Sequence, residues 1–137
     1  MRSKSLKGTV KARLLDQKAD PVREFYTSHP YPPPLENLDL LRDAWQALNP
    51  NRAEYHLHWP NKEYRSDLDV LIAGCGTWQA AMYAACHPDA RVVAIDVSPT
   101  SLEHTEALKR KHTLANLVTR QLTIENAAML EHGFDLV

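Results

Sequence analysis

Two glycines and one aspartate stand where two apolar runs of the sequence end. The run LDVLIAGCG carries Gly74 and Gly76 at its end, and these are two of the four glycines in the chain. The run ARVVAID ends at Asp96, twenty residues after Gly76. A glycine turn lets the backbone approach a ligand closely, and a carboxylate can accept hydrogen bonds from both hydroxyls of a ribose. The spacing predicts a site for a nucleoside-containing cofactor.

The elements that must position these residues alternate between strand and helix. Continuous apolar runs predict buried strands, and alanine-rich or capped stretches predict helices. The expected strands are 68–76, 90–96 and 116–124, with a fourth beginning at 134, and the expected helices are 77–86 and 98–114, followed by a short helix or turn over 126–133. Either Ser98 or Thr100 caps the second helix, and Glu103 completes a capping box if the cap is Thr100. The order predicts an α/β fold with a doubly wound, Rossmann-like parallel sheet, truncated after the start of the fourth strand.

A helical, proline-rich cap is expected ahead of this sheet. Seven of the nine prolines precede residue 61, and HPYPPP over residues 29–34 favours an extended segment. Asp20 followed by Pro21 is a favourable helix start. A later helix has an apolar stripe at Leu38, Leu41, Trp45 and Leu48. We therefore divide the chain into a basic flexible tail (1–19), the cap (20–66) and the sheet-forming part (67–137).

Composition and charge limit the class of protein. The chain has 137 residues, 44% hydrophobic and 24% charged, which is typical of one globular domain. No run reaches the length of a membrane span and the N-terminus lacks a secretory core, so we expect a cytoplasmic protein that has no membrane partner. Residues 1–23 carry seven Lys or Arg and two Asp, without aromatics to stack on bases, so a nucleic-acid partner is not expected. Cys75 and Cys86 have no disulfide or metal spacing and are interpreted as reduced thiols. Oligomeric state is not indicated.

Three segments carry a resemblance to a known family. VLIAGCGT, VVAIDVS and FDLV, in this order and spacing, resemble motif I, motif II and the start of motif IV of the class I S-adenosylmethionine-dependent methyltransferases. The resemblance covers residues 67–137. PYPPP is similar to the N-terminal region of a bacterial branch of the family, whose members continue past FDLV into a GVLHHL-type stretch. The resemblance implies methyl transfer from S-adenosylmethionine to an acceptor that the sequence does not identify.

The resemblance also implies which residues bind the cofactor. They lie at three strand ends: Ala73, Gly74, Cys75, Gly76, Asp96, Val97, Thr123 and Ile124. The residues after the first strand would lie along the methionine part, Asp96 would hold the ribose hydroxyls, and the remaining three would surround the adenine. Residues that complete catalysis generally come from after the fourth strand and from the cap, so no catalytic residue is assigned.

Three positions depart from the family pattern. Ile72 stands where an acid is frequent, Trp78 where a third glycine is usual, and Thr123 where an aspartate commonly meets the adenine amino group. An indole is too large to share the path of the cofactor. We expect Trp78 to turn into the helix–sheet interface rather than to cover the methionine tail as a lid.

The cap offers further candidates. Tyr26, His29 and Tyr31 are candidates to line the substrate site, and the alternative is that these aromatics clamp the proline segment onto the core. His56 and His58 would share one side of an extended segment, but a tetrahedral site needs more ligands, so no metal site is predicted.

Two other functions remain open at this stage. A nicotinamide dinucleotide-binding oxidoreductase domain shares the turn and the ribose acid, but its third small residue would fall at Gln79. A degenerate binding module without chemistry is favoured by Ile72, Trp78 and Thr123. We also expect residues 1–137 alone to be marginally stable and inactive, because a fourth strand ending at Val137 would form an open edge, as in a partial gene record.

Overall fold

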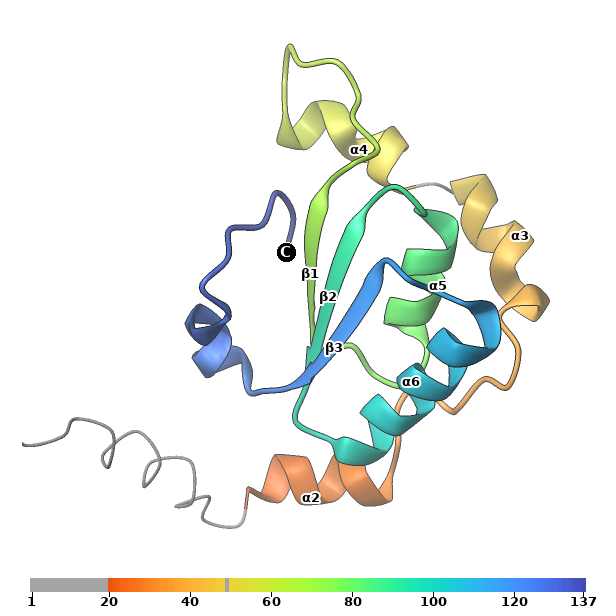
Figure 1. Ribbon diagram of the computed structural model, residues 1–137, viewed down its shortest axis with the longest axis vertical. Helices are drawn as coiled ribbons and strands as arrows, with labels where there is room; N and C mark the ends of the chain where they lie inside the picture. Colours follow the sequence, from red (N-terminus) through yellow and green to blue (C-terminus); the bar gives the residue numbers. More distant parts are fainter. Residues whose placement is uncertain (1–19, 49) are drawn as a thin grey trace, which may run out of the picture.

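Three parallel strands form the centre of the fold, as the sequence predicts (Figure 1). The computed structural model describes residues 20–48 and 50–137, and the tail expected over residues 1–19 lies outside them. The strands are β1 (Asp69–Ala73), β2 (Arg91–Asp96) and β3 (Leu117–Gln121), hydrogen-bonded in the order β1-β2-β3. Since all three run in parallel, their carboxyl ends share one edge, and the turns after β1 and β2 lie side by side.

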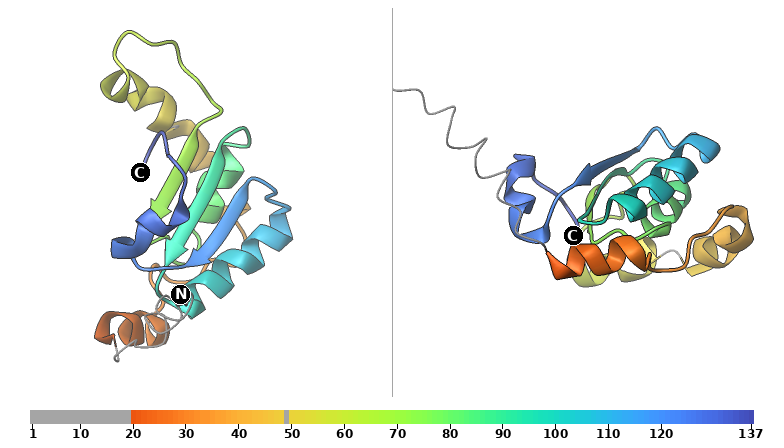
Figure 2. Two further views of the ribbon diagram at one scale, coloured as in Figure 1. Left: turned by 60° about the vertical axis from the view of Figure 1, so that its left-hand side comes forward. Right: turned by 90° about the horizontal axis from the view of Figure 1, so that it is seen from below.

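Side chains along the strands alternate between two apolar layers. Val70, Val92 and Ala94 pack with α5 (Gln79–Cys86) and α6 (Pro99–His112), whereas Leu71, Val93 and Ile95 pack with the segment that contains η1 (Ile124–Leu130). Figures 1 and 2 show α5 and α6 on one side of the sheet and η1 on the other. Burial on both faces explains why the strand sequences are apolar without interruption.

The chain returns to the free edge of β1 near its end. Leu136 forms an isolated parallel bridge with Val70, and the Leu71 amide donates to the Leu136 carbonyl at 2.9 Å. The predicted start of a fourth strand is therefore present as one bridge beside β1. This position gives β1 a neighbour on each side, which is the strand order of a doubly wound sheet.

Ser98 begins helix α6. Its Oγ accepts a hydrogen bond from the Ser101 amide at 3.2 Å, which identifies Ser98 rather than Thr100 as the N-cap. The capping box of Thr100 with Glu103 is consequently not formed. The N-cap of α6 thus lies two residues after Asp96 in the sequence.

Three cap helices precede the sheet: α2 (Pro21–Ser28), α3 (Asp39–Leu48) and α4 (Pro50–His58). Asp20 caps α2 as predicted, because its Oδ1 accepts from the Val22 amide at 3.0 Å. The extended segment predicted around His56 and His58 was wrong, since both lie in α4, where residues two apart point about 200° apart around the helix axis. Within the described ranges, no cluster of three His, Cys, Asp or Glu could hold a metal ion.

The cap shares its core with the sheet and its helices. Leu38 is completely buried in the same apolar cluster as α5, and its amide donates to His112 Nε2 at 3.3 Å. Arg42 Nη2 donates to the Ala85 carbonyl at 3.3 Å. Contacts of this kind predict that cap and sheet unfold together. Among residues 20–48 and 50–137, no helix has the length and apolar character that crossing a membrane requires.

Leu38→Ala tests this shared core. We expect it to lower the free energy of unfolding by about 2–4 kcal/mol, because it removes a buried side chain and leaves a cavity. Leu40→Ala is the matched control: Leu40 is 71% exposed two residues away, and its loss should change stability by less than about 0.5 kcal/mol. Urea unfolding followed by circular dichroism and by tryptophan fluorescence measures both. Equal effects of the two substitutions would contradict a cap packed on the sheet.

Candidate functional site

The turn after β1 is held against the end of β2. The amides of Gly74 and Cys75 both donate to the Ile95 carbonyl, at 2.8 and 3.0 Å. Gly74 and Gly76 have φ of +72° and +61°, a left-handed conformation that favours glycine. The sequence therefore needs two glycines here for backbone geometry alone.

The two glycines face different surroundings. A Cβ added at exposed Gly74 would meet nothing within 4 Å, whereas one at buried Gly76 would lie 2.8 Å from both Pro32 Cδ and the Tyr31 carbonyl oxygen. We call residues 29–34 the strap, and it crosses directly over Gly76. Thr77 Oγ1 fixes it there by donating to the Pro32 carbonyl at 2.7 Å. Gly74 thus leaves space open to a ligand, and Gly76 leaves space for the strap.

Asp96 connects the turns after β1 and β2. Its Oδ2 accepts from the Gly76 amide at 3.0 Å, and its Oδ1 accepts from the Ser98 amide at 2.8 Å. A carboxylate has about four acceptor positions, so these two bonds leave room for further donors. The half-buried Asp96 is therefore both a structural bridge and a possible acceptor for ligand hydroxyls.

A pocket of about 480 Å³ opens at this edge of the sheet. That volume is within the usual range for small-molecule sites. Of the predicted cofactor residues, it is lined by Gly74, Gly76, Asp96, Val97, Thr123 and Ile124. The cap closes another side with Asp20, Val22, Tyr26 and Tyr31. Residues from both halves of the chain, far apart in sequence, thus meet around one cavity.

Three predicted residues do not line this pocket. Ala73 lines a different cavity, on the sheet face beside α4. Cys75 is completely buried in the apolar cluster that includes α5 and does not line the pocket. His29 stacks on Phe25 with ring centroids 4.8 Å apart, and its Nδ1 lies 3.3 Å from the Phe25 carbonyl oxygen. Its ring is engaged with α2 instead of the pocket.

Burial decides the chemistry of Cys75. Removal from water, with a smaller contribution from the nearby Asp96 charge, raises the pKa of its thiol to about 12. Burial also raises the pKa of Cys86. Both thiols are therefore neutral near physiological pH, and neither is suited to act as a nucleophile.

Trp78 lies beside the glycine turn but outside the pocket. It occupies the N-cap position of α5, and its ring meets that of Trp45 edge-on at a centroid distance of 6.1 Å. The indole also packs against the buried cluster that α5 shares with the sheet, in agreement with the predicted helix–sheet interface, and the Trp45 ring of cap helix α3 is an additional partner. The indole stabilises the cap and leaves the pocket open.

Sequence reasoning missed several lining residues: Asp20, Val22, Gln79, Ser101, Leu122 and Glu125. Gln79 and Ser101 lie in the first turns of α5 and α6, and a general rule that such turns face the crevice could have found them. Asp20 was interpreted only as a helix cap. Nothing in its local sequence indicates that α2 lies against the turn after β2.

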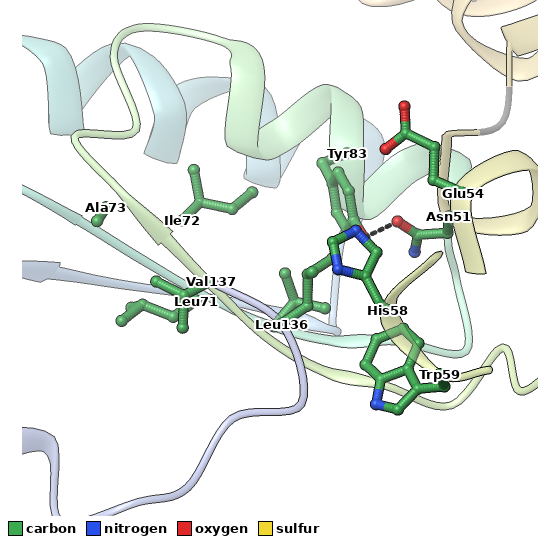
Figure 3. A pocket seen from close by; sticks show the side chains of 11 residues that line it. Asn51, Glu54, His58, Trp59, Leu71, Ile72, Ala73, Tyr83, Leu136 and Val137 are labelled. Atoms are coloured by element: carbon green, nitrogen blue, oxygen red, sulfur yellow. Dashed lines mark hydrogen bonds between the residues drawn. The ribbon is translucent and has the colours of Figure 1, made fainter. Parts of the chain in front are cut away.

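A second cavity, of about 460 Å³, lies on the sheet face beside α4 (Figure 3). Its lining residues come mainly from β1 and α4, with Tyr83 from α5 and Leu136 and Val137 at the end of the chain. Figure 3 shows Tyr83 and Asn51 joined by a hydrogen bond, which spans 2.5 Å. Burial raises the pKa of Tyr83. This cavity includes neither Asp96 nor either glycine of the turn, so we assign the cofactor site to the pocket at the strand ends.

Comparison with known proteins identifies the family. Residues 70–137 match the family model described as a methyltransferase domain. The chain belongs to the class I S-adenosylmethionine-dependent methyltransferases. The cofactor of this family is S-adenosylmethionine, so the resemblance noted in the motifs is confirmed, whereas the assignment of PYPPP to one branch stays a prediction.

One curated protein and one solved structure are each similar to part of this chain. Malonyl-[acyl-carrier protein] O-methyltransferase of Acetivibrio thermocellus is 31% identical over 96 residues, which are 69% of this chain and 32% of that protein. The chain thus spans about a third of the length of this curated relative. A crystal structure of coclaurine N-methyltransferase bound to N-methylheliamine and SAH is similar over 61% of this chain and 22% of that one, with 24% identity and a TM-score of 0.46.

The residues that line the pocket at the strand ends fit S-adenosylmethionine. The pocket has open space at Gly74 and remaining acceptor positions on Asp96. Val97, Leu122 and Ile124 offer apolar surface to a base. Thr123 stands where the family commonly has an aspartate, and its Oγ1 accepts from Asn126 Nδ2 at 2.9 Å. That bond orients the Thr123 side chain at the N-cap position of η1.

The two glycines of the methyltransferase turn should respond differently to alanine. Both substitutions strain the backbone, but only Gly76→Ala also drives a Cβ into the strap. We expect Gly76→Ala to lower the free energy of unfolding by about 2 kcal/mol more than Gly74→Ala does. Urea unfolding of both variants measures the difference. Equal destabilisation would mean that the strap does not rest on Gly76.

Cys75 should make stability depend on pH in the alkaline range. The thiol of the unfolded chain ionises near its ordinary pKa of 9.0, while burial keeps the native thiol protonated up to about 12. The folded pKa of this acid is raised, so stability is complete below pH 9 and falls as pH rises towards 12. Between about pH 8 and 10, the wild type should lose roughly 1 kcal/mol more than Cys75→Ala. Parallel curves for the two proteins would contradict a buried neutral thiol.

Proposed function

We propose that this protein transfers a methyl group from S-adenosylmethionine to an acceptor, with the pocket at the strand ends as the cofactor site. The observation that carries the proposal is the electrostatic character of that pocket. Asp20, Asp96 and Glu125 line it, and its lining residues in the described part of the chain include no Lys, Arg or His. S-adenosylmethionine has one net positive charge, whereas a dinucleotide carries a negatively charged pyrophosphate. The pocket therefore favours the sulfonium cofactor.

The backbone of the turn supports the same choice. A dinucleotide fold aims free amides of its glycine turn at the pyrophosphate. Here the amides of Gly74 and Cys75 are bonded to Ile95, and that of Gly76 is bonded to Asp96. Gln79 also occupies the place of the third small residue of a dinucleotide site and lines the pocket. These features argue against the nicotinamide alternative.

The catalytic task of these residues is positioning. When bound, S-adenosylmethionine supplies a methyl group on a positively charged sulfur. Asp96 would orient the ribose, Val97 and Ile124 would hold the adenine, and the open side of Gly74 would admit the methionine part. Displacement at the methyl carbon requires alignment of donor and acceptor, so fixed placement of the donor accounts for much of the rate. A base is needed only where the acceptor must lose a proton.

The proposal concerns the donor and leaves the acceptor unassigned. The name of the Acetivibrio relative specifies a malonyl-acyl-carrier-protein acceptor, but the present chain aligns with 32% of that protein. The degenerate-module alternative is weakened because Trp78, its bulkiest departure, packs on Trp45 away from the pocket. The cytoplasmic location expected from the sequence stays a prediction.

Ligand binding to the purified protein tests the proposal. Calorimetric titration should show binding of S-adenosylmethionine and none of NADH at the same concentrations. Asp96→Asn should weaken binding at least about tenfold, because it removes a charged acceptor from the ribose position. Asp89→Asn, at the other end of β2, and Trp78→Phe should each leave the affinity within about twofold, as neither residue lines the pocket. NADH binding in the absence of S-adenosylmethionine binding would favour the oxidoreductase alternative.

A further inference from the structure

One end of the pocket has to receive a carboxylate without help from a basic side chain. The methionine part of S-adenosylmethionine carries a free carboxylate, and such a group needs hydrogen-bond donors when it leaves water. The lining residues in the described part of the chain include no Lys, Arg or His. Resting on the proposed function, we propose that Tyr31 and Gln79 are the residues that bind this carboxylate, and that they make the pocket select ligands with an amino-acid part.

The order of the strands indicates where the methionine part lies. The carboxyl ends of β1, β2 and β3 follow one another along one edge of the sheet. Leu122 and Ile124, which follow β3, offer apolar surface for adenine, and Asp96 at the end of β2 offers an acceptor for the ribose. A ligand with its adenine at β3 and its ribose at β2 has its methionine part at the end of β1.

The backbone at the β1 end of the pocket has no spare donor among its lining glycines. The lining residues at this end are Gly74, Gly76, Gln79 and Tyr31. The Gly74 amide is bonded to the Ile95 carbonyl at 2.8 Å, and the Gly76 amide is bonded to Asp96 at 3.0 Å. Each amide carries a single hydrogen, and glycine has no side chain. The donors for a carboxylate at this end are therefore the side chains of Tyr31 and Gln79.

The strap fixes Tyr31 at this end. Its carbonyl oxygen lies so close to Gly76 that a Cβ added there would be 2.8 Å away. The next residue, Pro32, is held by the completely buried Thr77, whose Oγ1 donates to the Pro32 carbonyl at 2.7 Å. The Tyr31 backbone is thus fixed over the turn after β1, while Tyr31 itself is 67% exposed and lines the pocket. Tyr31, a candidate for the acceptor site on sequence grounds, is thereby assigned to the methyl donor.

Gln79 reaches the same end from the sheet side. It is the exposed first residue of α5, three residues after Gly76. Its side-chain amide can donate to a carboxylate, as can the hydroxyl of Tyr31. Within residues 20–48 and 50–137, neither of these two groups has a hydrogen-bond partner. Both donors are therefore available to a ligand.

The other tyrosine of the cap lies nearer the opposite part of the ligand. The Tyr26 carbonyl accepts from Ser98 Oγ at 3.2 Å, and the Ser98 amide donates to Asp96 at 2.8 Å. Tyr26 is thus anchored at the end of β2, where the ribose is expected. Removal of the same hydroxyl group from the two tyrosines should consequently affect different parts of the cofactor.

Two ligands that differ in the amino-acid part test the assignment. S-adenosylhomocysteine has this part, whereas methylthioadenosine has the same nucleoside and thioether without it. The wild type should bind S-adenosylhomocysteine at least about thirtyfold more tightly, as measured by calorimetric titration. Tyr31→Phe should weaken S-adenosylhomocysteine binding about tenfold, because it removes a hydrogen bond to a charged group. It should change methylthioadenosine binding by less than about twofold, because this ligand has no carboxylate.

Gln79→Glu is a second variant, which keeps the size of the side chain. Its new carboxylate would repel that of the ligand, so S-adenosylhomocysteine binding should fall at least about tenfold. Methylthioadenosine binding should again change by less than about twofold. An acid in the first turn of a helix is favourable, so the variant should retain its fold.

Tyr26→Phe is the matched control, since it removes a tyrosine hydroxyl from another part of the pocket. Any change in affinity should be the same for both ligands. Equal affinities of the wild type for the two ligands, or equal effects of Tyr31→Phe and Gln79→Glu on both, would overturn the inference and leave the proposed function intact. A wild type that bound neither S-adenosylmethionine nor S-adenosylhomocysteine would instead contradict the proposed function.

Discussion

The hydrogen bond from the Gly76 amide to Asp96 is the interaction on which the site depends. It joins the turn after β1 to the turn after β2 at 3.0 Å, and the second oxygen of the same carboxylate holds the Ser98 amide that starts α6. Two neighbouring strand ends are thus tied through one side chain. Because a carboxylate in this position is stabilised by backbone donors, it can point into the pocket without a basic partner.

The glycine turn serves the cap as well as the ligand. Gly74 opens on the cavity, whereas Gly76 gives its space to the Tyr31–Pro32 backbone. Thr105 Oγ1, buried in α6, donates towards the carbonyls of Gly76 and Thr77, at 3.1 Å each. The turn is therefore fixed from the strap on one side and from α6 on the other. A small-residue motif that looks like a ligand site in sequence is also a packing site in the fold.

The strands, the two helices between them and the N-cap at Asp20 could be predicted because their signals are local. Continuous apolar runs, an alanine-rich helix and an Asp-Pro start need no tertiary information. The contacts of the cap could not be predicted. His56 and His58 were placed on an extended segment because alternation over three residues does not distinguish a strand from a helix. The partner of Trp78 and the pocket position of Asp20 depend on packing between segments far apart in the sequence.

The cap is part of the cofactor pocket and not a separate layer above it. Asp20, Val22, Tyr26 and Tyr31 supply one side of the cavity, and hydrogen bonds from Thr77 and Ser98 hold that side against the strand ends. Gly76 and Asp96 bind each other, and the two donors lie close to them in the sequence. Thr77 directly follows Gly76, and Ser98 is two residues after Asp96. The same two turns thus form the floor of the site and anchor its cover. Displacement of the cap segment 20–34 would remove these four lining residues at once, so ligand binding and docking of the cap stabilise each other.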